Sequence, residues 1–343
     1  MHFMLRAPQL KKNVLIVRLD AIGDYILWRN VLAFIRQSAA YRNTRITILG
    51  NPAWRGLAEA FDAKLADEWI WVEKRATLFR KGYENLLPGC IWRRRVQREQ
   101  EKLRTLLKAR HFDEVISPQA FPDEQLDSLV RDIAPVTIGV ASDRPSPSVV
   151  LTRRLDPGKE PFVFLKNRSI ATALTGQTCD VSLSIKLDTA VEKRNEVIFF
   201  VGASHWTRRW PMHRWNELAR LVRERIGCSV AFAGRPGEPY RPFHEFVANL
   251  AGARAVVSND TMALHLAAAL DIPTVAVVNG VSGRDGFWPY PASLGKKVAI
   301  VEPSNRPSSF LPGIAGRQIG QYAALASIGA SDVFCVLSGI LAC

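Results

Sequence analysis

The stretch NVLIVRLDAIGDYILWRN, residues 13–30, decides the fold of the first half of the chain. It opens with an unbroken apolar run rich in β-branched residues, which is typical of a strand buried on both faces of a parallel sheet. The Gly23-Asp24 pair follows, and the pattern from about Tyr25 to Ser38 predicts a helix. A buried strand that turns into a helix begins a βαβ unit, so we expect an α/β protein.

The same alternation of strand and helix continues in two halves. The first half adds the strand RITILG (residues 45–50), and the second half restarts with NEVIFFVGAS (residues 195–204). Strands that alternate with helices pair in parallel and form doubly wound sheets. Between the halves lies an irregular stretch with the breaker signals DRPSPS and DPGKEP. We predict two Rossmann-like domains that face across a cleft, with boundaries at residues 1–165, a linker at 166–194, and residues 195–343.

Composition and charge narrow the class of protein. The chain has 343 residues, 48% hydrophobic and 23% charged, which is typical of globular proteins. The five cysteines are scattered and do not have the spacing of a zinc site. The sequence also has no apolar run long enough to cross a membrane and no signal peptide, so we predict a cytoplasmic protein. The net charge of +14 favours anionic partners. The densest basic patch, residues 92–104, fits a solvated helix face as well as a binding role, and no nucleic-acid-binding module accompanies it.

Ligands of parallel α/β sheets bind at the carboxyl ends of strands, and four stretches of this sequence fall at such places. The first is the Gly23-Asp24 pair. Asp24, near a helix start, can cap free backbone amides and complement the helix dipole. A carboxylate there can also accept a proton from an attacking hydroxyl. The local sequence supports the two roles equally.

The second stretch, VGASHWTRRWPMHRW (residues 201–215), is a strand-end turn of small residues followed by Arg208 and Arg209. Backbone amides, hydroxyls and guanidinium groups are the donors that a phosphate group needs. The coincidence of a strand end, small residues and basic residues favours an anion site over a surface loop with two solvated arginines.

The third and fourth stretches end the next two strands. In the third (residues 256–280), Asn259 to Thr261 mark a helix start whose polar groups can hold sugar hydroxyls or diphosphate oxygens. His265 lies one turn further on, either as a ligand contact or as a satisfied core histidine. The fourth stretch (residues 279–291) offers glycines for close backbone approach and Arg284 as a cation, or is an ordinary flexible loop.

As an ordered set, the stretches VLIVRLDAIGDYIL, GASHWTRRWPMHRWNELA and VVSNDTMALHLAAALDIPTVAVVNG resemble glycosyltransferase family 9, the ADP-heptose:lipopolysaccharide heptosyltransferases. The resemblance implies the two-domain GT-B fold. It also implies that Asp24 is the general base on the acceptor hydroxyl and that Arg209, followed by Trp210, meets the donor phosphates. Asp260, Thr261 and His265 would bind the donor sugar and diphosphate.

The predicted site therefore has a catalytic residue, Asp24, and an acceptor side with Gly23 and Arg18. The predicted donor side comprises Ser204, Arg208, Arg209, Trp210, Asn259, Asp260, Thr261, Met262, His265, Gly280 and Arg284. Met262 departs from the family pattern, which has glycine after Asp-Thr. A side chain leaves less room for a diphosphate there, although the backbone amide stays available. The stretch GRDGFWPY resembles a subset of the family, which implies a donor or acceptor outside core lipopolysaccharide assembly.

The implied reaction is inverting transfer of a sugar, first of all heptose from ADP-heptose, to a hydroxyl of lipopolysaccharide or another surface glycan. No cofactor is expected, and no metal, because basic residues and helix dipoles can hold the diphosphate charge and a DxD motif is absent. Peripheral contact with the inner membrane face fits the positive charge, and nucleic acid is not a predicted partner. Two other functions stay open: a nucleotide-sugar epimerase or hydrolase, and a non-catalytic protein that binds glycan or nucleic acid.

Overall fold

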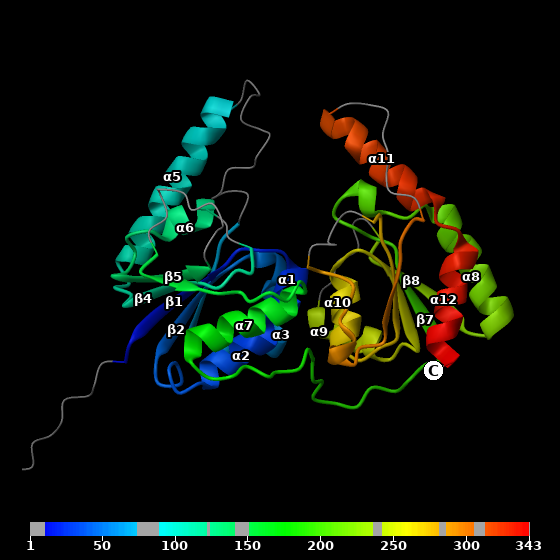
Figure 1. The fold of residues 1–343 in the computed structure, drawn as a ribbon, viewed down its shortest axis with the longest axis horizontal. Coiled ribbons are helices and arrows are strands. Elements are labelled where there is room, and N and C mark those ends of the chain that lie inside the picture. Colours follow the sequence, from blue (N-terminus) through cyan, green and yellow to red (C-terminus); the bar gives the residue numbers. More distant parts are fainter. Residues whose placement is uncertain are drawn as a thin grey trace, which may run out of the picture. The chain divides into compact units, whose positions relative to one another are not determined.

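The computed structural model describes residues 11–73, 89–121, 124–140, 151–235, 242–280, 286–304 and 313–342. The chain forms two compact units, each built around its own sheet (Figure 1). The first unit comprises residues 1–21, 31–160 and 165–181. The second unit comprises residues 22–30, 161–164 and 182–343, so it takes two short pieces from the N-terminal half of the sequence.

The first unit has a six-stranded parallel sheet in the order β3-β2-β1-β4-β5-β6. From β1 the chain continues to β2 on one side, and β4 lies on the other, which is the doubly wound arrangement that the sequence predicts. The strands are β1 (Asn13–Arg18), β2 (Arg45–Gly50), β3 (Glu68–Trp71), β4 (Glu114–Ser117), β5 (Val136–Val140) and β6 (Arg153–Leu155). The helices are α2 (Arg29–Gln37), α3 (Arg55–Phe61), α5 (Gly89–Lys108), α6 (Glu124–Val130) and α7 (Val163–Thr175), with short 3-10 turns η1 (Pro52–Trp54) and η2 (Ala63–Leu65).

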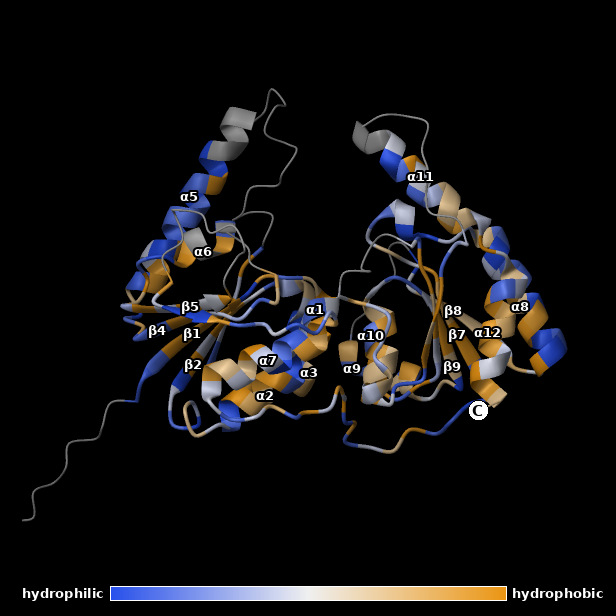
Figure 2. Ribbon diagram, viewed as in Figure 1, coloured by the Kyte–Doolittle hydropathy of each residue, from blue (hydrophilic) through white to orange (hydrophobic). Residues whose placement is uncertain are grey.

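Helices cover both faces of this sheet because its central strands are apolar throughout. On one face, Leu15 and Val17 of β1 pack with Leu103 and Leu107 of α5 and with Leu126 of α6. Helices α2 and α7 lie on the opposite face (Figure 1). Most of the described residues of α5 are hydrophilic (Figure 2), and this helix contains residues 92–104, the basic patch of the sequence.

The second unit has a five-stranded parallel sheet in the order β11-β10-β9-β7-β8. The strands are β7 (Glu196–Phe200), β8 (Ser229–Ala233), β9 (Ala255–Asn259), β10 (Thr274–Val277) and β11 (Val298–Val301). The helices are α1 (Ile22–Ile26), α8 (Met212–Ile226), α9 (Phe243–Ala251), α10 (Met262–Ala269), α11 (Gly313–Ser327) and α12 (Ala330–Ala342), with 3-10 turns η3 (Trp206–Arg208) and η4 (Ala292–Leu294).

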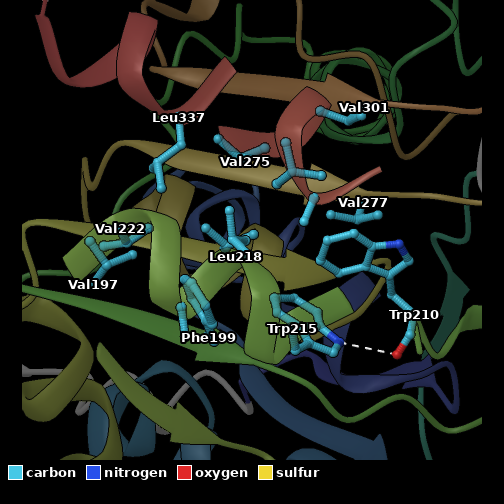
Figure 3. Close-up of a cluster of buried hydrophobic side chains, with 14 of the residues drawn as sticks. Val197, Phe199, Trp210, Trp215, Leu218, Val222, Val275, Val277, Val301 and Leu337 are labelled. Atoms are coloured by element: carbon cyan, nitrogen blue, oxygen red, sulfur yellow. Dashed lines mark hydrogen bonds between the residues drawn. The ribbon is translucent and has the colours of Figure 1, made fainter. Parts of the chain in front are cut away.

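The core of the second unit lies between its sheet and helices α8 and α12 (Figure 3). Phe199 of β7 and Val275 of β10 face Trp215 and Leu218 of α8 and Leu337 of α12, and all five side chains are fully buried. Helix α8 buries the side that carries these apolar residues. The helix ends at Gly227, which adopts the left-handed conformation (φ 71°) that favours glycine.

Two local predictions need correction. The helix expected from about Tyr25 to Ser38 is divided into α1 and α2, because Leu27 and Trp28 form a turn in which the Trp28 amide donates to the Tyr25 carbonyl (3.0 Å). The break separates α1, which belongs to the second unit, from most of α2, which belongs to the first. The stretch predicted to be irregular between 143 and 195 contains α7, which also occupies the start of the predicted linker.

Among the described residues, no single helix is long and apolar enough to cross a membrane. Residues 316–327 of α11 and helix α12 meet the length and composition criteria only as a pair that is bent by 61°.

Candidate active site

The carboxyl ends of β7 and β9 form the topological switch point of the second unit. From β7 the chain moves outward to β8, and β9 lies on the other side of β7, so the loops after these two strands run in opposite directions. Ligands of open α/β sheets bind at such a point. The loops that follow β7, β9 and β10 contain the second, third and fourth sequence stretches, so all three predicted donor stretches lie on one edge of one sheet.

Asn259, the last residue of β9, holds the loop after β7 in place. Its Oδ1 atom accepts a hydrogen bond from the Trp210 amide (3.1 Å), and its Nδ2 atom donates to the Val201 carbonyl (2.8 Å). Trp210 is fixed in turn, because its indole donates to the Ile328 carbonyl (3.2 Å) and its own carbonyl accepts from the Trp215 indole (3.1 Å; Figure 3). Both side chains are buried and engaged in hydrogen bonds that hold the loop after β7 in place, and their predicted contact with the donor stays a prediction.

Glycine is required where the loops after β7 and β8 meet. A Cβ atom on Gly202 would overlap the Gly234 carbonyl group, and a Cβ on Gly234 would overlap the Phe200 ring. Two backbone segments therefore touch without intervening side chains. The Gly-Ala-Ser turn predicted to be a phosphate loop is thus also a packing element. Ser204, two residues after Gly202, is exposed.

The structure gives different roles to the two arginines of this loop. The Arg209 Nε atom donates to the Ala203 carbonyl (3.0 Å), which fixes the loop internally. Arg208 ends η3, and its Nη1 atom lies 3.6 Å from Oδ2 of Asp260. The Arg208 side chain is 38% exposed, whereas that of Asp260 is 8% exposed. Arg208 thus lies beside the helix start after β9, whereas Arg209 is bound to its own loop, and their predicted contacts with the donor phosphates stay predictions.

Helix α10 begins at this same edge with its free backbone amides. Thr261 is the N-cap, and its side chain accepts a hydrogen bond from the Ala263 amide (3.3 Å), while the Ser258 hydroxyl lies 3.2 Å from the Thr261 hydroxyl. The remaining amides of the first turn and the helix dipole favour an anion. Burial raises the pKa of Asp260, and Arg208 acts in the opposite direction. The Arg208 guanidinium, which faces the Asp260 carboxylate, and the α10 N-terminus together are called the candidate anion site below.

His265 lies in α10, one turn beyond the N-cap, and is 4% exposed. Its Nδ1 atom is 2.7 Å from the hydroxyl of Tyr290, whose ring lies against Phe162 from the 161–164 segment, with ring centroids 4.7 Å apart. Burial lowers the pKa of His265 to about 3 and raises that of Tyr290 well above its ordinary value. Both groups are therefore neutral at physiological pH, and His265 is a hydrogen-bonding group without charge.

The Gly23-Asp24 pair belongs to the second unit, because α1 packs against α10. A Cβ atom on Gly23 would lie 3.0 Å from Cδ2 of His265 and 3.9 Å from Cα of Met262. Glycine at position 23 thus permits the close packing of two helices that are about 240 residues apart in the sequence. Asp24, the next residue, is half-buried. Met262 is buried as the first residue of α10, so its side chain fills space beside the first turn.

The other predicted residues divide between the two units. Arg18 ends β1 in the first unit, where it is buried, forms an ion pair with Asp20 (2.6 Å) and donates to the Pro118 carbonyl (2.8 Å). Gly280, after β10, has a φ of 77°, which favours glycine. The predicted cation Arg284 lies outside the described residues. The described residues include no group of three or more His, Cys, Asp or Glu side chains that could hold a metal ion.

The sequence analysis did not single out Tyr290 or Trp288. Trp288 is buried, and its indole favours the charged form of Asp260, which lowers the pKa of that carboxyl against the effect of burial. Both aromatic residues lie in the GRDGFWPY stretch. The sequence feature that could have pointed to these two residues is the group of aromatic residues directly after a glycine-containing loop at the end of a strand.

The order of each sheet and the position of the candidate anion site at a switch point define the class: two Rossmann-like units of the GT-B fold. Comparison with solved structures agrees. The chain is similar to the Escherichia coli heptosyltransferase WaaC with ADP-2-deoxy-2-fluoro heptose (20% identity, TM-score 0.68, 95% of this chain and 99% of that one). It is also similar to the glycosyl transferase family 9 protein of Veillonella parvula (20% identity, TM-score 0.64, 98% and 99%). The likeness to E. coli ADP-heptose lps heptosyltransferase II has a TM-score of 0.61 at 17% identity, over 96% and 98%.

Sequence comparison finds a family match over part of the second unit. Residues 238–302 match the family described as Glycosyltransferase family 9 (heptosyltransferase). The chain is also 36% identical over 99 residues to lipopolysaccharide heptosyltransferase 1 of Pseudomonas aeruginosa, a match that covers 24% of this chain and 28% of that protein. The aligned part thus spans less than a third of the length of that relative. These partial matches agree with the resemblance to glycosyltransferase family 9 that the sequence motifs carry.

Proposed function

We propose that the protein is an inverting, metal-independent glycosyltransferase that moves a sugar, first of all heptose from ADP-heptose, to a hydroxyl of lipopolysaccharide or another surface glycan. The observation that carries this proposal is the packing of α1 on α10. It brings the residue before Asp24 against His265, in the helix whose N-terminus and neighbouring Arg208 form the candidate anion site. A carboxylate and a diphosphate site in one unit are the two parts that sugar transfer requires.

In the proposed reaction, the acceptor oxygen attacks the anomeric carbon of the donor sugar. The acceptor proton passes to the Asp24 carboxylate as the new carbon–oxygen bond forms. On the opposite face, the bond between the anomeric carbon and the diphosphate oxygen breaks, and the diphosphate leaves with the bonding electrons. Arg208 and the first-turn amides of α10 stabilise the charge that grows on this oxygen, a contribution that is often the largest in catalysis.

The acceptor and the place of action are part of the proposal. The side chains of Arg94, Arg95, Arg98 and Lys102 on α5 are exposed, and they form a positive surface for the phosphates of a glycolipid. We propose that the enzyme works in the cytoplasm, with α5 in peripheral contact with the anionic inner membrane face, and without a nucleic-acid partner.

Mass spectrometry of the reaction products tests the function. The protein is incubated with ADP-heptose, or with common UDP- and GDP-sugars, in the presence and absence of extracted glycolipid. The proposal predicts a glycolipid heavier by one heptose unit together with free ADP, both dependent on acceptor. Release of free sugar without acceptor, or conversion of the donor into an isomer, would instead establish a hydrolase or an epimerase. Absence of any product with every donor would contradict an enzymatic function.

A further inference from the structure

Tyr290 is the protein partner of the buried His265 imidazole. The two side chains come from α10 and from the loop after β10, and the Tyr290 hydroxyl lies 2.7 Å from Nδ1 of His265. The Tyr290 ring is held in place by Phe162, at 4.7 Å between centroids. The backbone beside Phe162 is also fixed, since the Val163 amide donates to the Gly286 carbonyl (2.6 Å). The hydroxyl is therefore presented to the imidazole by a well-supported ring.

The direction of this hydrogen bond follows from the available partners. Among the described residues, the Tyr290 hydroxyl has no hydrogen-bond partner besides Nδ1. If Nδ1 carried the proton and donated, the hydroxyl hydrogen would be left without an acceptor, which is costly for a buried group. If the hydroxyl donates to Nδ1, both atoms are satisfied. A phenol is also a good donor to the basic nitrogen of a neutral imidazole, and both groups are neutral here because burial shifts their pKa values apart.

A hydroxyl that donates to Nδ1 requires the proton of neutral His265 to reside on Nε2. The Cδ2–Nε2 edge of the ring faces α1: the Cβ position of Gly23 is 3.0 Å from Cδ2 and 3.6 Å from Nε2. Nε2 has no hydrogen-bond partner among the described residues. An uncharged N–H donor thus lies beside the Gly23-Asp24 pair and one turn from the α10 N-terminus.

We propose that Tyr290 is a positioning residue that fixes His265 as its Nε2–H tautomer, so that Nε2 donates a hydrogen bond to an oxygen of the sugar nucleotide. The part concerning the ligand rests on the proposed function, whereas the tautomer is a property of the protein alone. Because Nε2–H carries no charge, it can donate to an oxygen of the ligand both before and after the diphosphate leaves. Its strength does not change with pH in the physiological range.

The experiment is 15N NMR of the full-length protein labelled in its histidines, recorded at pH 7.5 with and without ADP. The His265 signals are assigned by their loss in His265→Asn. Wild type is expected to show a neutral Nε2–H imidazole, and Tyr290→Phe a mixture of both tautomers. ADP is expected to bind about fivefold more weakly to Tyr290→Phe. Tyr41→Phe is the matched control, because it removes another buried hydroxyl, which donates to Glu114 (2.7 Å) in the first unit. It should leave the His265 signals unchanged.

An Nδ1–H tautomer in wild type, or an unchanged Nε2–H tautomer in Tyr290→Phe, would overturn the proposal. A wild-type protein with the expected tautomer that fails to bind ADP would contradict the proposed donor site and leave the role of Tyr290 in place. The two failures are therefore distinguishable in one set of spectra.

Discussion

The two units contain the same kind of switch point but fill it differently. In the first unit, the carboxyl end of β1 carries Arg18, whose guanidinium is buried and bound to Asp20 and to the Pro118 carbonyl. In the second unit, the ends of β7 and β9 carry Arg208, which is 38% exposed, and a helix N-terminus. The arginine at the edge of the first sheet is buried and paired, whereas the arginine at the edge of the second sheet is partly exposed to solvent. The sheet topology thus determines at which edge a ligand can bind. Whether an arginine at that edge stabilises the fold or is available to a ligand depends on the groups that surround its side chain.

Replacement of Arg18 should have the largest effect on stability. Arg18→Met leaves the Asp20 carboxylate without its cation and the Pro118 carbonyl without its donor, so the free energy of unfolding should fall by about 3 kcal/mol. Denaturant unfolding followed by circular dichroism measures this loss. ADP affinity of the folded fraction should stay close to that of wild type. A large loss of ADP affinity with normal stability would contradict this structural role and place Arg18, predicted on the acceptor side, in the donor site.

Replacement of Arg208 by Met in the second unit should weaken ADP binding and leave stability nearly unchanged. Arg208→Met removes a half-exposed cation, so stability should change by less than about 1 kcal/mol. ADP binding, measured by calorimetry, should weaken by about tenfold to a hundredfold, because a charged hydrogen-bond donor to the diphosphate is lost. Arg209→Met is the matched control. If it weakens ADP binding more than Arg208→Met does, the assignment of the phosphate cation to Arg208 is wrong.

A smaller effect is expected from pH. Because burial lowers the pKa of His265 to about 3, the unfolded chain takes up a proton near pH 6.5 that the folded protein does not. Stability should therefore fall as pH decreases through this range. Between pH 7.5 and 5.5, wild type should lose about 1.4 kcal/mol more than His265→Asn does. An equal loss in both proteins, by denaturant unfolding at the two pH values, would show that His265 titrates normally in the folded state.

Local patterns in the sequence were enough to predict the central strands of both sheets, although not the edge strands β3, β6 and β11. Apolar runs such as residues 13–18 and 255–259 are unambiguous because both faces of each strand are buried. The strand-end position of Thr261 followed from the same pattern, and its capping role is a local property. Helix α7 was missed because the breaker residues before it dominate the composition of that stretch, although its own sequence is regular.

The roles of individual site residues depend on contacts between distant segments, which local patterns do not contain. Nothing near Trp210 in the sequence indicates that its indole donates to the carbonyl of Ile328. The choice between Arg208 and Arg209 depends on which of them reaches Asp260, which is 52 residues from Arg208 in the sequence. The contact of Gly23 with His265 joins two segments that are about 240 residues apart in the sequence. The sequence was therefore enough to predict which stretches lie at the strand ends. Which of their residues hold the loops in place, and which are available to a ligand, follows only from the fold.

The most direct test of the central claim is the rate of sugar transfer by Asp24→Asn, with Asp332→Asn as its control. Asp332 is an acid in the first turn of α12 that caps the helix by accepting from the Gly329 amide (3.0 Å), so its replacement by Asn measures the cost of removing the charge of a capping carboxylate alone. If Asp24 is the base, Asp24→Asn should lose about a hundredfold to ten-thousandfold in rate at saturating ADP-heptose and keep its affinity for ADP, while Asp332→Asn transfers at the wild-type rate. Transfer by Asp24→Asn at the rate of Asp332→Asn would contradict the account and reduce Asp24 to a helix cap.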